Sequence, residues 1–124
     1  MKDYDKARKY YLECLKSDSK YKDANERYSF LLYEKGDIES ALEYVEKELR
    51  IRDPNMYMIF NYGYFNHLLG NKIESEKGIK QAIKLIETIE DKDKLLKALR
   101  INESDQQSLE FLNRFKECLE HKFE

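Results

Sequence analysis

The side chains best suited to chemistry are few in this chain of 124 residues, which has two histidines and two cysteines. Cys118 and His121 stand three residues apart, so on a helix they would share one face and could hold a soft metal ion. Two ligands do not complete a metal site, and we expect no metal there. His67 has no nucleophile or orienting carboxylate assigned beside it, so we expect it to hydrogen-bond a ligand or to pack as a neutral ring.

Carboxylates are abundant, but they recur at helical spacing from cations. Glu43, Glu46 and Glu74 each have a Lys or Arg three or four residues further on, which is the spacing of ion pairs on a solvated helix face. Paired carboxylates for glycoside hydrolysis need an enclosed cleft and a fixed separation, which this pattern does not indicate. No glycine-rich phosphate loop is present either. We therefore expect no catalytic centre, no cofactor and no enzymatic activity.

The composition favours helices throughout. The chain has one Pro and four Gly, while 39% of its residues are charged and 41% are hydrophobic, which is enough apolar material for a core. The net charge is −2, and no long stretch has an excess of one sign of charge, because acidic and basic residues alternate closely. A nucleic-acid site would need cations gathered on one face, and the nearest case is Lys94, Lys97 and Arg100. We expect an all-α chain with no nucleic-acid partner.

The sequence shows no targeting or membrane-spanning pattern. The N-terminal residues have no apolar run behind their charges, and nowhere do about 18 uncharged apolar residues follow one another. Cys14 and Cys118 lie far apart and lack the dense spacing of a disulfide framework. These observations favour a cytoplasmic protein that does not enter a membrane.

The strongest pattern is an internal repeat. Ala7, Ala41 and Ser75 are equally spaced along the chain, and this spacing is the repeat interval. All three of these residues are small, and Gly36 and Gly70 fall one interval apart where a helix should end. The same interval relates Tyr11, Val45 and Ile79, then Leu15, Leu49 and Ile83, then Asp3, Asp37 and Asn71. A period that carries apolar, small and capping positions together is typical of stacked helical units.

This repeat resembles the tetratricopeptide repeat (TPR) family, whose 34-residue unit is a pair of antiparallel helices. The residues that match the family pattern best are Ile59, Tyr62, Gly63, Ser75, Ile79 and Ala82, and their similar counterparts one unit earlier are Asn25, Tyr28, Ser29, Ala41 and Val45. Asn25, Glu48 and Asn66 depart from the pattern, because the family has apolar, small or aromatic residues there. The resemblance implies that Ala41, Val45, Tyr62, Gly63, Ile79 and Ala82 are buried between helices.

The fold implied by the resemblance is a right-handed antiparallel-helix solenoid of TPR-like helix pairs. We expect a single domain over 1–124, with a half unit at about 1–19, units at about 20–53 and 54–87, and C-terminal capping helices at about 88–124. The expected helices span 3–17, 20–35, 37–52, 54–69, 71–90, 92–102 and 104–122. Asp53, Asn71 and Ser104 are the expected N-caps of the fourth, fifth and seventh helices.

The TPR resemblance also implies a binding site, because the first helices of such units line a concave groove. Its positions in this chain are Arg27, Phe30, Tyr33, Tyr57, Phe60, Asn61, Tyr64 and His67. Tyr57, Phe60 and Tyr64 recur at i, i+3 and i+7, so they share one helix face and are suited to anchor a peptide or a partner helix. The alternative is that these rings belong to the core or cover the last helix.

Two binding functions follow as hypotheses. The first is a protein–protein interaction module, or scaffold, that binds a protein or peptide in the aromatic groove. The second is a structural assembly protein that forms homo-oligomers or docks through its first helix, whose residues Ala7, Tyr11 and Cys14 would lack their usual partner helix. A chaperone-tail clamp is not expected, since Asn61 alone fits its pattern.

Overall fold

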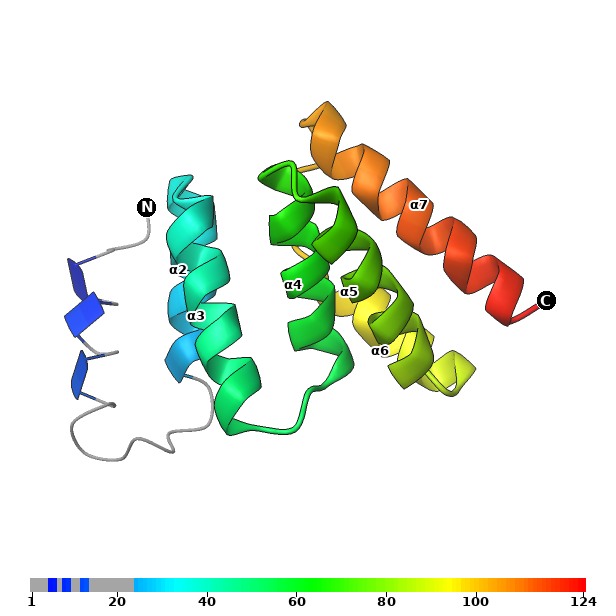
Figure 1. The fold of residues 1–124 in the computed structure, drawn as a ribbon, viewed down its shortest axis with the longest axis horizontal. Helices are drawn as coiled ribbons and strands as arrows, with labels where there is room; N and C mark the ends of the chain where they lie inside the picture. Colours follow the sequence, from blue (N-terminus) through cyan, green and yellow to red (C-terminus); the bar gives the residue numbers. More distant parts are fainter. Residues whose placement is uncertain (1–4, 7, 10–11, 14–23) are drawn as a thin grey trace. The chain divides into compact units, whose positions relative to one another are not determined.

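All regular secondary structure in the described part of the chain is α-helical, as the composition predicts. The computed structural model describes residues 5, 6, 8, 9, 12, 13 and 24–124. Its labelled helices are α2 (Ala24–Lys35), α3 (Ile38–Ile51), α4 (Met56–Leu68), α5 (Lys72–Leu85), α6 (Ile89–Ala98) and α7 (Gln106–Lys122), shown in Figure 1. Ala7, Tyr11 and Cys14, on which docking through the first helix depends, lie outside the described residues.

The chain divides into two compact units, Met1–Asp53 and Pro54–Glu124. The first contains the α2–α3 hairpin, and the second contains the α4–α5 hairpin together with α6 and α7. The organisation as one solenoid domain stays a prediction.

The two hairpins use the same turn, one repeat interval apart. Gly36 and Gly70 have φ angles of 90° and 81°, a left-handed conformation that glycine adopts without steric cost. In the first hairpin Asp37 N donates to Leu32 O at 2.9 Å, and in the second Asn71 N donates to Asn66 O at 2.8 Å. The repeat in the sequence is therefore a repeat in backbone hydrogen bonding.

The predicted N-caps are correct in location but not always in residue. The fourth helix is capped by Asn55, whose Oδ1 accepts from Met58 N at 2.9 Å, and not by Asp53. The seventh is capped by Asp105, whose side chain accepts from Ser108 N, and not by Ser104. Asn71 occupies the N-cap position of α5 but makes no side-chain capping bond. More than one potential capping residue lies near a helix start, and only the backbone path determines which of them caps the helix.

The expected helix 71–90 is wrong at its C-terminal end, because two helices meet there. α5 ends at Leu85, and α6 begins at Ile89, three residues earlier than expected, with Thr88 as its N-cap. Thr88 Oγ1 accepts from Asp91 N at 3.0 Å, while Asp91 Oδ2 accepts from Thr88 N at 3.3 Å, which forms a reciprocal capping box. The signal was present in the sequence as Thr88-x2-Asp91.

Replacing Thr88 by Ala should lower the free energy of unfolding by about 0.5–2 kcal/mol, because the first turn of α6 would lose its side-chain acceptor. Urea unfolding followed by circular dichroism measures this. Thr88→Ser is the matched control, since it keeps a hydroxyl in place and should behave nearly as wild type. Equal stability of the Ala and Ser variants would mean that the capping box does not hold α6.

Five of the six residues expected to be buried between helices are buried. Ala41 and Val45 lie in the first hairpin, and Gly63, Ile79 and Ala82 lie in the second. Tyr62 is half-buried instead, because its hydroxyl reaches the surface and donates to Glu74 Oε2 at 2.6 Å. An amphipathic tyrosine buries its ring and keeps its polar end near water.

The α4–α5 crossing is held close by two glycines. A Cβ atom built on Gly78 would lie 2.6 Å from Gly63 Cα and 2.9 Å from Gly63 N. No real Cβ atom tolerates such distances, so the two helices meet backbone to backbone at this point. The sequence predicts that Gly63 is buried between helices, whereas the repeat pattern does not predict the matching role of Gly78.

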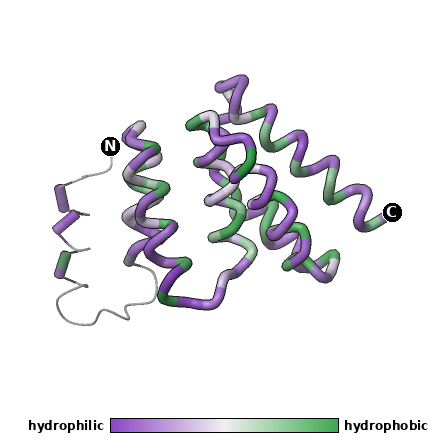
Figure 2. Tube along the Cα trace, viewed as in Figure 1, coloured by the Kyte–Doolittle hydropathy of each residue, from purple (hydrophilic) through white to green (hydrophobic). Residues whose placement is uncertain are grey.

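The last helix completes the second unit by lying along α4 and α5 (Figure 1). Apolar and polar residues alternate along α7 in Figure 2. Its buried residues are Ser108, Phe111, Leu112, Phe115 and Leu119. This three- and four-residue spacing produces one apolar stripe that faces α4 and α5. No helix in the described residues is long and apolar enough to cross a membrane.

Candidate functional site

The eight predicted groove residues lie on two helices that belong to different units. Arg27, Phe30 and Tyr33 are on α2, whereas Tyr57, Phe60, Asn61, Tyr64 and His67 are on α4. The structure therefore shows two candidate surfaces, one in each unit.

Two of the predicted anchors, Phe60 and Tyr64, are core residues. Each is only 2% exposed, so the expectation that they line an open groove is wrong. The Phe60 ring packs edge-on against Phe111 and Phe115, with centroid distances of 5.3 and 4.8 Å. The Tyr64 hydroxyl lies 2.7 Å from Ser108 Oγ in a buried hydrogen bond. The alternative interpretation, that these rings cover the last helix, is correct.

His67 also contacts α7 and does not face an open groove. Its Nε2–H donates to Gln107 O at 3.0 Å, and Gln107 Nε2 donates back to His67 O at 3.1 Å. The imidazole ring lies 5.4 Å from the ring of Phe111. These contacts connect the last turn of α4 to the first turn of α7, so His67 has a structural role.

Tyr57 and Asn61 keep the exposure that a binding residue needs. Both are half-buried on α4, one helical turn apart. Within the described residues, neither the Tyr57 hydroxyl nor the Asn61 amide forms a hydrogen bond. Nearby on α6, an ion pair with Glu90 at 3.1 Å raises the pKa of Lys94 above its ordinary value, and Tyr57 contributes to the same effect. The Tyr57 ring thus lies within the electrostatic influence of the Lys94 ammonium group.

The α2 surface contains an aromatic pair at the positions that Tyr64 and His67 occupy on α4. Phe30 and Tyr33 precede Tyr64 and His67 by one repeat interval. Their rings lie 6.0 Å apart, and both side chains are half-buried. Arg27 is exposed one turn before them. In the second unit the equivalent residues, Tyr64 and His67, contact α7.

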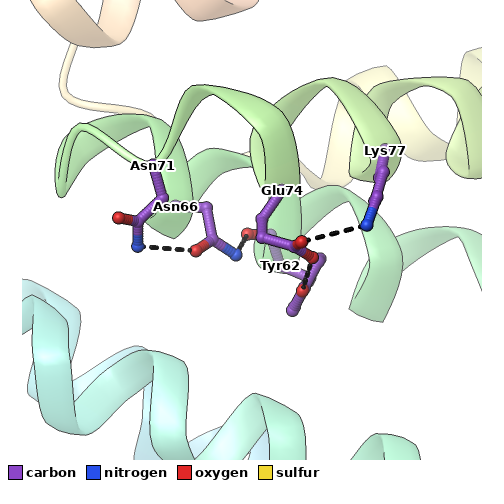
Figure 3. A network of polar contacts seen from close by, with 5 residues as sticks. All are labelled: Tyr62, Asn66, Asn71, Glu74 and Lys77. Atoms are coloured by element: carbon purple, nitrogen blue, oxygen red, sulfur yellow. Dashed lines mark hydrogen bonds and ion pairs between the residues drawn. The ribbon is translucent and has the colours of Figure 1, made fainter.

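A polar network on the α4–α5 hairpin was not predicted from the sequence (Figure 3). Tyr62 donates to Glu74, which also pairs with Lys77 at 3.1 Å, and Asn71 Nδ2 donates to Asn66 Oδ1 at 3.0 Å. The Tyr62 hydroxyl, followed by Lys77, lowers the pKa of the Glu74 carboxyl below its ordinary value. The groups bind one another across the hairpin, so the network fastens α5 to α4.

Two contacts fasten α7 to α5. Arg114 donates from Nε and Nη2 to the two carboxylate oxygens of Glu76, at 2.6 and 2.8 Å. This bidentate pair lowers the pKa of Glu76 and raises that of Arg114 relative to their ordinary values. Lys122 Nζ donates to Ile83 O at 2.6 Å. The two contacts fix the register of α7 along α5.

Metal binding finds no support among the described residues, in which no three His, Cys, Asp or Glu side chains are grouped closely enough to hold an ion. Cys118 is half-buried, and His121 Nδ1 lies 3.6 Å from a carboxylate oxygen of Glu124. Together these features describe a helical-hairpin protein with two candidate surfaces. No protein-family profile, curated protein or solved structure matches the chain.

Proposed function

We propose that this protein is a protein–protein interaction module of the TPR type, which binds a peptide or a helix of a partner. The observation that carries the proposal is the shared geometry of the two hairpins. Both have a left-handed glycine at the turn, the same backbone hydrogen bonds, and small residues at the helix crossing, all related by the repeat interval. Repeated helix pairs of this kind are building units of solenoids that bind partners through their extended surfaces.

The proposed binding residues are those predicted positions that are not taken up by α7. They are Arg27, Phe30 and Tyr33 on α2, and Tyr57 and Asn61 on α4. Phe30 and Tyr33 would supply aromatic contacts, because rings lose little conformational entropy on binding and bury a large area. Asn61 would bind partner backbone groups, since an amide both donates and accepts hydrogen bonds.

The proposal also includes the arrangement of the hairpins, the place where the protein acts and the kind of activity. The hairpins would stack as a right-handed solenoid within one domain, the protein would act in the cytoplasm, and its activity would be binding without catalysis. Assembly of several copies is an alternative outcome of the same experiment, in which the captured partner would be a second copy of this chain.

We expect Tyr33→Ala and Asn61→Ala each to weaken partner binding by about 1–4 kcal/mol, the range of interface hot spots. Partners would be captured from a lysate of the source cells with the intact protein and identified, and their affinities would then be measured for each variant. Each substitution should leave thermal unfolding nearly unchanged, because both side chains are only half-buried.

Ile73→Ala is the matched control, since Ile73 is a 75% exposed apolar side chain outside both candidate surfaces. It should bind the partner as the wild type does. The proposal fails if the captured protein binds all three variants with wild-type affinity. It also fails if binding is lost equally in the control, because the loss would then not depend on either surface.

A further inference from the structure

The first hairpin contains a polar cluster of Asn25, Glu48 and Arg52, of which Asn25 and Glu48 are buried and Arg52 is half-buried. Asn25 Nδ2 donates to Glu48 Oε2 at 2.8 Å, and Arg52 Nε forms an ion pair with Glu48 Oε1. Asn25 is 7% exposed and Glu48 only 2% exposed, so the hydrogen bond between α2 and α3 lies inside the hairpin. Asn25 and Glu48 are two of the residues that depart from the TPR pattern.

The second hairpin has apolar residues at the equivalent positions. One repeat interval onward, the counterparts of the polar cluster are Ile59, Ala82 and Ile86. Their exposed fractions are 3%, 0% and 0%, so all three are buried. The two hairpins thus have the same backbone turn, but equivalent positions between their helices are polar in the first hairpin and apolar in the second.

A second difference lies at the helix crossing itself. In the first hairpin Ser29 Oγ donates to Ala41 O at 2.7 Å, and the Tyr44 ring packs edge-on against Tyr28 at 4.9 Å. The equivalents of Ser29 and Tyr44 are Gly63 and Gly78, whose backbones touch. Side chains therefore fill the first crossing, whereas in the second a Cβ atom on Gly78 would clash with the Gly63 backbone and one on Gly63 would need a small shift of its neighbours.

We infer that these two differences form a pairing code, by which α2 selects α3 and α4 selects α5. Similar helical units in one chain can exchange equivalent helices, either within the chain or between copies. If α2 paired with α5, Asn25 would lose its Glu48 acceptor and face Ala82 and Ile86. The Ser29 side chain would also enter a tighter crossing, where a Cβ atom at the Gly63 position meets Ser75 O at 3.3 Å. Both changes are unfavourable, because one leaves a buried amide without its acceptor and the other overpacks the contact.

The reverse exchange is disfavoured for the same reasons. If α4 paired with α3, the apolar Ile59 would face the Glu48 carboxylate in the place of Asn25. Glu48 would keep its ion pair with Arg52, which follows it in the chain, but would lose the donor that Asn25 supplies to its other oxygen, and an isoleucine side chain offers none. The code thus penalises both exchanged pairings and favours only the two native ones.

The same code explains why a polar cluster is kept inside the hairpin. Replacing a buried ionic cluster by apolar residues of similar size often leaves stability unchanged or raises it. Stability alone therefore does not account for Asn25, Glu48 and Arg52, whereas a choice between competing partner helices does. Stability and pairing can be measured separately, and this separation provides the test.

The test is the full-length variant Asn25→Ile/Glu48→Ala/Arg52→Ile, in which the first hairpin receives the residues of the second. Its free energy of unfolding in urea should be at least that of the wild type. After refolding over a range of protein concentrations, its dimer and larger fractions should exceed those of the wild type by about fivefold or more. Size-exclusion chromatography and native mass spectrometry measure these fractions.

The control is Glu43→Ile/Arg50→Ile, which adds apolar side chains to the exposed face of α3 without touching the polar cluster. It should refold with the monomer fraction of the wild type. The inference is overturned if the triple variant refolds as the wild type does, or if the control oligomerises as much. Should the triple variant fail to fold, Asn25→Ile alone decides, because it removes the bond between the helices and must raise oligomer formation. No binding partner is involved, so the result is independent of the proposed function.

Discussion

Replacing Phe60 by Ala should lower the free energy of unfolding by about 3–5 kcal/mol, the range for truncating a core aromatic ring. Phe60 is 2% exposed and packs edge-on against both Phe111 and Phe115 of α7. The substitution removes the ring around which α4 and α7 meet, and it leaves a cavity that helices on two sides cannot easily close. Urea unfolding followed by circular dichroism in the far ultraviolet, where helices give the signal, measures the loss.

Tyr57→Ala is the matched control for this prediction. Tyr57 lies on the same helix, one turn earlier, and its ring is only half-buried, so its truncation should cost much less. Phe115→Ala tests the same contact from α7 and should be as damaging as Phe60→Ala. If Phe60→Ala unfolded as the wild type does, the ring would lie on an open groove and the α4–α7 contact would be refuted.

Replacing Gly78 by Ala should reduce stability by about 2 kcal/mol or more, although alanine favours helices by about 1 kcal/mol over glycine. The new methyl group would lie 2.6 and 2.9 Å from two backbone atoms of Gly63. Backbone atoms cannot rotate away as a flexible side chain can, so α4 and α5 would have to separate along the hairpin. Thermal and urea unfolding both report this loss.

Gly63→Ala is the control at the facing position. Its methyl group would meet Phe111 Cζ and Ser75 O, both at 3.3 Å, which requires a shift of a few tenths of an ångström. The helix propensity of alanine offsets part of that cost, so the loss should be smaller than for Gly78→Ala. The opposite order of the two variants would contradict the backbone contact between Gly63 and Gly78.

The sequence was sufficient to predict the helical hairpins, because their signals are local and repeated. Gly36 and Gly70 mark the turns through their left-handed conformation, and Ala41, Val45, Ile79 and Ala82 mark the buried faces through helical spacing. The boundary at Thr88 was missed because apolar residues continue across it. The capping box that divides α5 from α6 depends on two side chains and their backbone path.

The aromatic residues of α4 show what the local sequence pattern does not determine, which is the partner that a helix face meets. Tyr57, Phe60 and Tyr64 have the spacing of one helix face, and this spacing is the same whether the face meets a separate partner or a helix of its own chain. The amino-acid sequence thus establishes the all-helical class and the repeated hairpin. Three-dimensional packing alone assigns Phe60 and Tyr64 to the core, because their contacts with Phe111 and Phe115 join residues more than a whole repeat apart in the chain, beyond the reach of any periodic pattern.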